Sequence, residues 1–178
     1  MEAARRDPRA FEPLYRKYVS QVYSFAVYEL RDHHRAEDLT EVVFLRALAA
    51  LPRFHERGDG QRSTFRVWLF QIARNALANE RRRLRRRPES PIELADMVAS
   101  GEDPATTIGD RDALARAWRA IDRLPEDRRR ALVLRFVEEM STVEIAGVLG
   151  RSEGAVRVLI HRALRAVAAA TDGRGDAS

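Results

Sequence analysis

The stretch of sequence that decides the fold runs from Ser141 to Val167 and reads STVEIAGVLGRSEGAVRVLIHRALRAV. It opens with Ser-Thr-Val-Glu, a capping box in which the serine hydroxyl and the glutamate carboxylate each bond a free backbone N–H at a helix start. The helix that follows carries Ile145 and Leu149 on its inner side. It is predicted to end at Gly150, because glycine readily adopts the left-handed conformation that closes helices.

A second, longer helix is predicted directly after this turn. Ser152 is a second N-cap, and apolar residues recur behind it at three- and four-residue steps: Val156, Ile160, Ala163 and Val167. Two helices joined in this way form a helix-turn-helix, whose second helix enters the major groove of DNA. Its outward face carries side chains that can reach base edges or phosphates: Arg157, His161, Arg162 and Arg165. A structural helix-turn-helix with a merely solvated face is the alternative, but the short first helix, capped turn and arginine face together favour DNA binding.

Helical periodicity extends over the rest of the chain, and no segment has a convincing strand alternation, so the fold class is predicted to be all-α. A first helix should begin near Ala10 and bury one stripe of residues: Phe11, Leu14, Tyr15, Tyr18, Val22 and Phe25. A second should run from about Arg35 to Leu51. A third should follow an N-cap at Ser63 and continue into an arginine run that Pro88 ends.

The composition of the chain changes after the arginine run. Residues 88–110 are rich in Pro, Gly, Ser, Thr, Asp and Glu, which is typical of a flexible linker. We therefore predict two small helical domains, over residues 1–87 and 111–171, followed by a tail over residues 172–178.

Charge and composition favour a polyanionic partner in a reducing compartment. The 178 residues carry a formal net charge of +5, and Lys17 is the only lysine among 32 basic residues. Arginine presents a planar fork of donors that suits phosphates and guanine edges, although GC-rich coding alone could also produce this bias. The chain has no cysteine and no run of about 20 apolar residues, and we expect a cytoplasmic protein without membrane insertion.

A metal-dependent enzyme is a rival reading, based on a cluster of possible ligands: Asp32, His33, His34, Glu37 and Asp38. Adjacent histidines point in different directions on a helix, and the HExxH spacing of zinc enzymes is missing. The GxxxxGK[ST] loop of nucleotide hydrolases is missing as well. We expect no metal, no cofactor and no catalytic residue.

Three stretches taken together carry a resemblance to a known family: residues 36–47, which read AEDLTEVVFLRA, residues 65–75, and residues 124–164. They closely resemble an extracytoplasmic-function (ECF) sigma factor of bacterial RNA polymerase, in the sigma-70 family. The order of the motifs and the chain length also match. The resemblance implies a promoter-specificity factor that binds core RNA polymerase, recognises the minus-ten and minus-thirty-five promoter elements and helps to open DNA. It further implies that an anti-sigma factor holds the protein inactive.

The N-terminal half is similar to sigma region two, which implies roles for several of its residues. Its second helix would dock on the coiled coil of the polymerase beta-prime clamp through Asp38, Glu41, Phe44 and Leu48. Single-stranded minus-ten bases would be held in a pocket of Phe54, Arg62 and Phe65 and read by Asn75 and Asn79. Duplex phosphates just upstream would meet Arg81, Arg82 and Arg85. The family usually has glutamate where this chain has Val42, so one expected carboxylate is missing.

The C-terminal half resembles sigma region four, which reads the minus-thirty-five element and packs on the polymerase beta flap. The resemblance assigns this reading to Arg157, His161, Arg162 and Arg165. The family commonly has a serine-arginine pair where this chain has Val158 and Leu159. A stand-alone helix-turn-helix regulator remains the alternative function, and it would bind duplex DNA without the polymerase.

Overall fold

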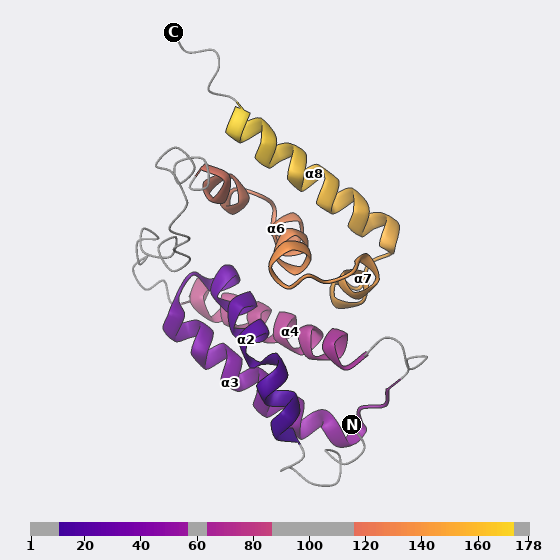
Figure 1. Ribbon diagram of the computed structural model, residues 1–178. Coiled ribbons are helices and arrows are strands. Elements are labelled where there is room, and N and C mark those ends of the chain that lie inside the picture. The colour runs from indigo at the N-terminus through magenta and orange to yellow at the C-terminus, as the bar shows by residue number, and fades with distance from the viewer. Residues whose placement is uncertain (1–10, 57–63, 87–115, 173–178) are drawn as a thin grey trace, which may run out of the picture. The chain divides into compact units, whose positions relative to one another are not determined.

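The computed structural model describes residues 11–56, 64–86 and 116–172, and every described element is helical (Figure 1). The chain divides into two compact units, and the described residues before position 87 belong to the first while most of those after position 115 belong to the second. Among the described helices, none is long and apolar enough to cross a bilayer. The predicted all-α class is confirmed. Ser63, Arg62, the predicted linker and most of the predicted tail lie outside the described residues.

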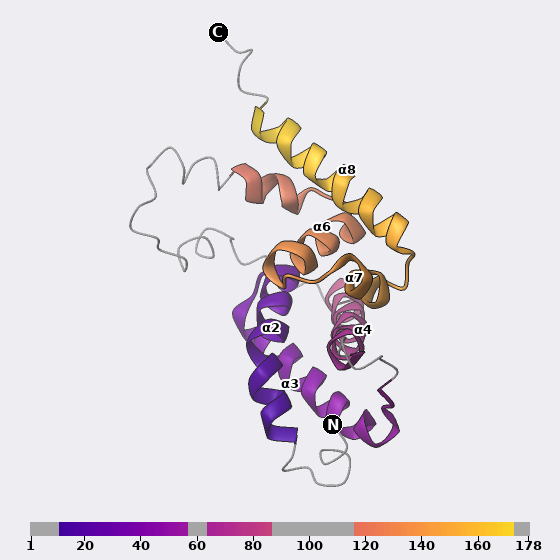
Figure 2. The ribbon, with the colours of Figure 1, turned by 45° about the vertical axis from the view of Figure 1, so that its right-hand side comes forward.

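The first unit is built from three long helices, α2 (Glu12–Leu30), α3 (His33–Ala50) and α4 (Thr64–Arg86). Helix α2 lies side by side with α3, and α4 packs against both (Figures 1 and 2). The core between them is largely aromatic and aliphatic, and its largest fully buried side chains include Val22, Phe25, Val43, Phe65, Phe70 and Leu77. The predicted stripe of α2 is confirmed at Val22 and Phe25, whereas Tyr15 in the same stripe is 44% exposed.

Two helix starts in the first unit depend on local chemistry. Pro13 stands at the second position of α2, where its missing N–H would have had no helical partner, so the helix begins near the predicted point. Helix α3 begins two residues earlier than the predicted Arg35. The reason is Asp32, whose carboxylate accepts from the Arg35 backbone N–H at 3.0 Å and thereby caps the helix. A short 3₁₀ turn, Leu51–Arg53, follows α3.

The second unit contains a helix over residues 116–122, then α6 (Glu126–Leu132), α7 (Thr142–Leu149) and α8 (Glu153–Asp172). Helix α6 packs against α8 around a small core of Leu124, Leu132 and Ala163. Helix α6 continues into one wide π turn, Val133–Val137, in which the Glu138 N–H bonds the Val133 carbonyl at 3.1 Å. The 3.6-residue period of the sequence contains no signal for this turn.

Candidate nucleic-acid interface

The start of α7 and the turn between α7 and α8 are fixed by the caps that the sequence predicts. The Ser141 N–H donates to the Glu144 carboxylate at 2.8 Å, and the Glu144 N–H donates back to the Ser141 hydroxyl at 3.3 Å. Gly150 closes α7 at a φ of +64°. The Ala155 N–H then donates to the Ser152 hydroxyl at 3.2 Å and starts α8. The capping box, the left-handed glycine and the second N-cap are all confirmed.

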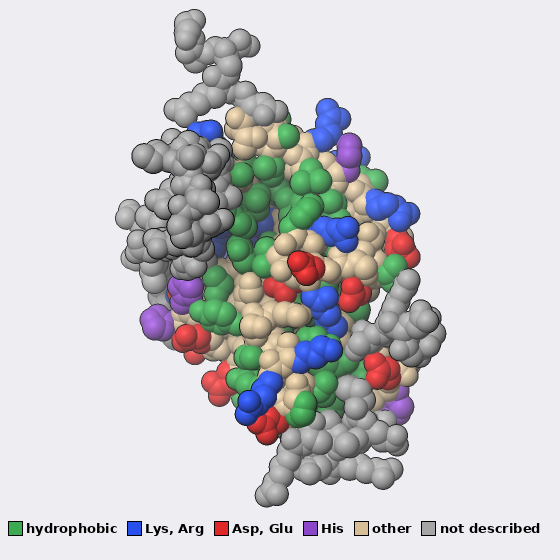
Figure 3. Space-filling model, in the orientation of Figure 1, with side chains coloured by type: hydrophobic (Ala, Val, Ile, Leu, Met, Phe, Trp, Pro, Cys, Tyr) green, Lys and Arg blue, Asp and Glu red, His purple; other side chains and the backbone are tan. Residues whose placement is uncertain are grey.

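Helix α8 has one buried stripe and a broad solvated face. Val156 and Ala163 are fully buried. The four predicted DNA-contacting side chains all lie on the exposed side: Arg157, His161, Arg162 and Arg165. Basic side chains and a histidine follow the outer edge of α8, at the upper right of Figure 3. Arg157 makes a long ion pair with Glu153, at 3.6 Å, and its guanidinium can exchange this contact for a phosphate or a base edge.

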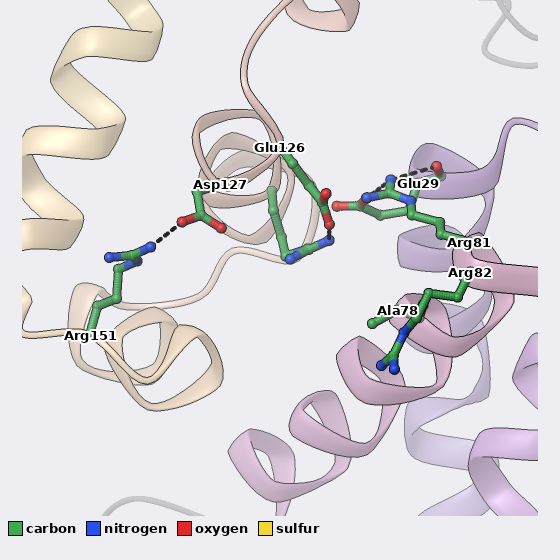
Figure 4. Close-up of polar contacts among 8 residues, drawn as sticks. Glu29, Ala78, Arg81, Arg82, Glu126, Asp127 and Arg151 are labelled. Carbon is green, nitrogen blue, oxygen red and sulfur yellow. Dashed lines mark hydrogen bonds and ion pairs between the residues drawn. The ribbon is translucent and has the colours of Figure 1, made fainter. Parts of the chain in front are cut away.

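Helix α6 contacts the helix-turn-helix through α8 and through the turn that precedes it. Asp127, in the first turn of α6, forms an ion pair with Arg151 in the turn that precedes α8 (Figure 4). Together with the packing of α6 on α8, this contact sets the angle at which the α8 face projects from the unit. The arrangement suits a helix that must enter a groove.

Helix α4 carries the second candidate reading face. Asn75 and Asn79 are exposed and lie one turn apart. Arg82 and Arg86 continue their spacing by three and then four residues, which places all four side chains on one face of the helix. A shallow hollow of about 320 Å³ on this face is lined by Asn79, Arg82, Arg83 and Arg86. Amide groups that can read base edges therefore lie in line with guanidinium groups that can bind phosphates.

Two arginines of this run are bound within the unit. Arg81 turns inward and forms an ion pair with Glu29, whose carboxylate is fully shielded (Figure 4). Arg83 is held by the Glu80 carboxylate through two bonds, of 2.9 and 2.8 Å. A signal for Arg81 exists in the sequence, because it stands four residues after the buried Leu77 and so continues the inner stripe. Arg86, by the same periodicity, lies on the face of α4 that carries the asparagines.

The predicted base pocket lies mostly in the core. Phe54 packs on Phe65 with ring centroids 5.7 Å apart and on Trp68 at 4.7 Å. Phe65 is fully buried and Phe54 is 8% exposed. Neither ring has an open face on which a base could stack, which a stacking platform requires. The third member of the predicted pocket, Arg62, lies outside the described residues.

The predicted polymerase-binding helix α3 borders a groove. Asp38 and Glu41 are exposed, Leu48 is half-buried, and Phe44 is buried against the Phe11 and Tyr15 rings. A groove of about 670 Å³ lies between α2 and α3, and its lining includes Tyr15, Glu41, Phe44, Leu45 and Leu48.

Apolar side chains project from the same helix into solvent. Leu45 is 58% exposed and Val42 is 37% exposed. Leu45 is therefore a candidate contact for a partner protein.

Potential metal ligands in the same unit are not grouped. In the part of the chain that the structure describes, no three His, Asp or Glu side chains lie close enough together to hold a metal ion. Asp32, one of the residues considered as ligands, caps α3 and pairs with Arg35 at 2.9 Å. His33 Nδ1 lies 2.8 Å from the Tyr23 hydroxyl.

The two stretches of sequence that carry the candidate faces each match a region of one known protein family. Residues 14–87 match Sigma-70 region 2, and residues 114–167 match Sigma-70, region 4. The chain therefore belongs to the sigma-70 family.

Curated relatives narrow this to the ECF group, as predicted. The chain is 34% identical over 160 residues to the ECF RNA polymerase sigma factor BldN of Streptomyces coelicolor, covering 89% of this chain and 59% of BldN. It is 34% identical over 172 residues to the RNA polymerase sigma-H factor of Pseudomonas aeruginosa, covering 92% of this chain and 86% of that protein. The structure of CnrH in complex with the cytosolic domain of CnrY is similar, with a TM-score of 0.66, 26% sequence identity and coverage of 98% and 95% of the two chains.

Proposed function

We propose that this chain is a promoter-specificity factor that binds core RNA polymerase and recognises one promoter at two places. The observation that carries the proposal is the presence of two separate helical units, each with an exposed face of base-reading and phosphate-binding side chains. On α8 this face holds Arg157, His161, Arg162 and Arg165, and on α4 it holds Asn75, Asn79, Arg82 and Arg86. Binding energy alone accounts for this activity, and the polymerase would form the phosphodiester bonds.

In this proposal α8 lies in the major groove of the minus-thirty-five element. Arginine is suited to the O6 and N7 acceptors of guanine, and histidine can serve as donor or acceptor. Val158 is 48% exposed beside these residues and presents a surface for a thymine methyl group. The reading would thus rest on fewer polar contacts than a serine-arginine pair would provide.

Helix α4 would meet the minus-ten element. Asn75 and Asn79 can each donate and accept at a base edge, whereas Arg82 and Arg86 would follow the phosphates of the adjacent duplex. Arg85 is exposed but lies off this face, so we assign it a lesser, purely electrostatic role. Arg81 is omitted from the phosphate contacts because Glu29 already binds its guanidinium.

Core polymerase would bind along α3. Asp38 and Glu41 supply exposed carboxylates, and Leu45 and Leu48 supply apolar surface at the edge of the groove. A contact with an apolar centre and charged edges is typical of protein interfaces. We place the protein in the cytoplasm and propose a protein inhibitor as a further partner, supported by the likeness to CnrH in its complex with CnrY.

A mobility-shift experiment separates this function from a stand-alone regulator. The full chain is incubated with duplex promoter fragments, with and without core polymerase. A sigma factor gives a specific shift only with core polymerase present, since its two faces must be placed by that enzyme. A specific shift with the chain alone, unchanged by core polymerase, would establish the regulator instead.

A further inference from the structure

An inward-facing arginine, Arg81, joins the C-terminal part of α4 to the C-terminal end of α2. Arg81 Nη2 donates to the carboxylate of Glu29 and also to its backbone carbonyl, the latter at 3.0 Å (Figure 4). The Glu29 carboxylate is 0% exposed, and the Arg81 side chain is 18% exposed. One guanidinium therefore binds both the charge and the main chain of a residue on another helix.

The contact lies at a sharp corner of the first unit. Glu29 is in the last turn of α2, where backbone carbonyls lack a helical partner, and Arg81 supplies one. Arg31 follows in the left-handed conformation at a φ of +56°, and Asp32 then caps α3. Arg81 thus binds the stretch of chain in which α2 ends and α3 begins.

The cationic end of α4 is only partly buried. Leu77 is fully buried, but in the described part of α4 no side chain beyond it is. Asn79, Arg82 and Arg86 all lie in this outer portion. A helix end without buried side chains frays readily unless another contact restrains it.

We propose that the Glu29–Arg81 pair is a positioning contact that holds the outer two turns of α4 in place, so that Asn79, Arg82 and Arg86 meet promoter DNA in a fixed geometry. The importance of the pair for transcription rests on the proposed function, whereas its effect on α4 does not. Preorganised side chains lose less conformational entropy when they bind, so the pair would favour DNA engagement without touching DNA.

Hydrogen exchange of the free, full-length protein tests the contact itself. In Arg81→Met, amide protection over residues 78–86 should fall by about tenfold, while residues 65–77 stay within about twofold of the parent. Arg16→Met is the matched control, because Arg16 is an exposed arginine of α2 whose partner is Glu12. If Arg81→Met does not fold, the double variant Glu29→Met/Arg81→Met serves, since it removes the pair without leaving a buried carboxylate unpaired. Unchanged protection over residues 78–86 would overturn the proposal.

Promoter opening by reconstituted holoenzyme tests the consequence. Glu29→Met and Arg81→Met should each slow opening by about fivefold or more, and the double variant should be no slower than the worse single, because both disrupt one contact. Affinity for core polymerase should change by less than about twofold. If Arg81 instead bound phosphate directly, Glu29→Met would leave opening intact and the two losses would be independent.

The outcomes separate the two proposals. A parent protein that supports no transcription contradicts the proposed function, and the exchange result then judges the contact alone. A parent that transcribes normally, with Glu29→Met equally active, overturns the positioning role and leaves the function standing. Equal losses of opening and polymerase affinity would mean that the pair acts only on folding and would also overturn it.

Discussion

Asp127 and Arg151 form an ion pair that joins α6 to the turn of the helix-turn-helix (Figure 4). The two side chains are 41% and 49% exposed, so water and salt screen their attraction. Apolar packing, including that of α6 on α8 around Leu124, Leu132 and Ala163, must therefore supply most of the stability of this unit, and the ion pair chiefly fixes the direction of the turn.

Arg151→Ala should consequently lower the free energy of unfolding of the second unit by less than about 1 kcal/mol. Urea denaturation followed by Trp118 fluorescence, in a Trp68→Phe background, measures this value. The difference from the parent should shrink further as salt is raised. A loss above about 2 kcal/mol would show that the pair contributes more than an exposed bridge.

Gly150→Ala should destabilise the same unit by about 1 to 2 kcal/mol, because alanine strains the backbone at a φ of +64°. Gly154→Ala is the matched control. Gly154 lies in the first turn of α8 with no atom within 4 Å of an added Cβ, and alanine there should be neutral or stabilise by up to about 1 kcal/mol. Equal effects at the two glycines would argue against the left-handed requirement.

Asn75→Ala should weaken promoter opening at the minus-ten element by about tenfold, the effect of losing one good base contact, and leave polymerase binding intact. The residue is exposed, so the fold should not change. Opening is followed by the reactivity of unpaired thymines, and core affinity by fluorescence anisotropy. Parallel losses of both would count against a base-reading role.

Arg82→Ala and Arg86→Ala should each reduce the slope of log affinity against log salt for promoter binding by about 0.9, since each removes one phosphate contact. Arg16→Ala, at an exposed arginine in α2 whose partner is Glu12, should leave the slope unchanged. The slope is measured with holoenzyme on duplex promoter. An unchanged slope for both α4 variants would show that neither arginine binds a phosphate.

Asp38→Lys and Leu45→Asp should each reduce affinity for core polymerase by about tenfold, through lost charge complementarity and lost apolar contact. Leu45 is 58% exposed, so the free energy of unfolding should change by less than about 0.5 kcal/mol. Glu56→Lys is an exposed control outside the groove. Unchanged core affinity in both variants would place the polymerase contact elsewhere.

Much of the fold could be predicted because helical period and capping chemistry are local properties of a sequence. The caps at Ser141 and Ser152 and the glycine at Gly150 appear where the residues predict them. The early start of α3, with Asp32 as its N-cap, was not predicted. Which residue caps this helix depends on the geometry of the preceding turn, and the sequence does not show that geometry. The π turn after α6 was missed because it depends on tertiary packing.

In the candidate sites too, features that depend on local sequence could be predicted, and features that depend on tertiary packing could not. Exposure of the α8 side chains follows from the buried stripe opposite them, so the sequence could indicate it. The burial of Phe54 and Phe65, and the pairing of Arg81 with Glu29, depend on which helices meet in space. The spacing of Arg81 from Leu77 indicates that its side chain turns inward, but nothing in the run of like charges identifies Glu29 as its partner.

Start-site selection by core polymerase is the direct test of whether this protein is a promoter-specificity factor. Core enzyme lacking any other specificity factor is supplied with this protein and a genomic fragment library, and the ends of the run-off transcripts are mapped. We expect discrete start sites that share two upstream elements, and loss of these sites when the protein is omitted. Transcripts that start at random, with or without the protein, would contradict this expectation.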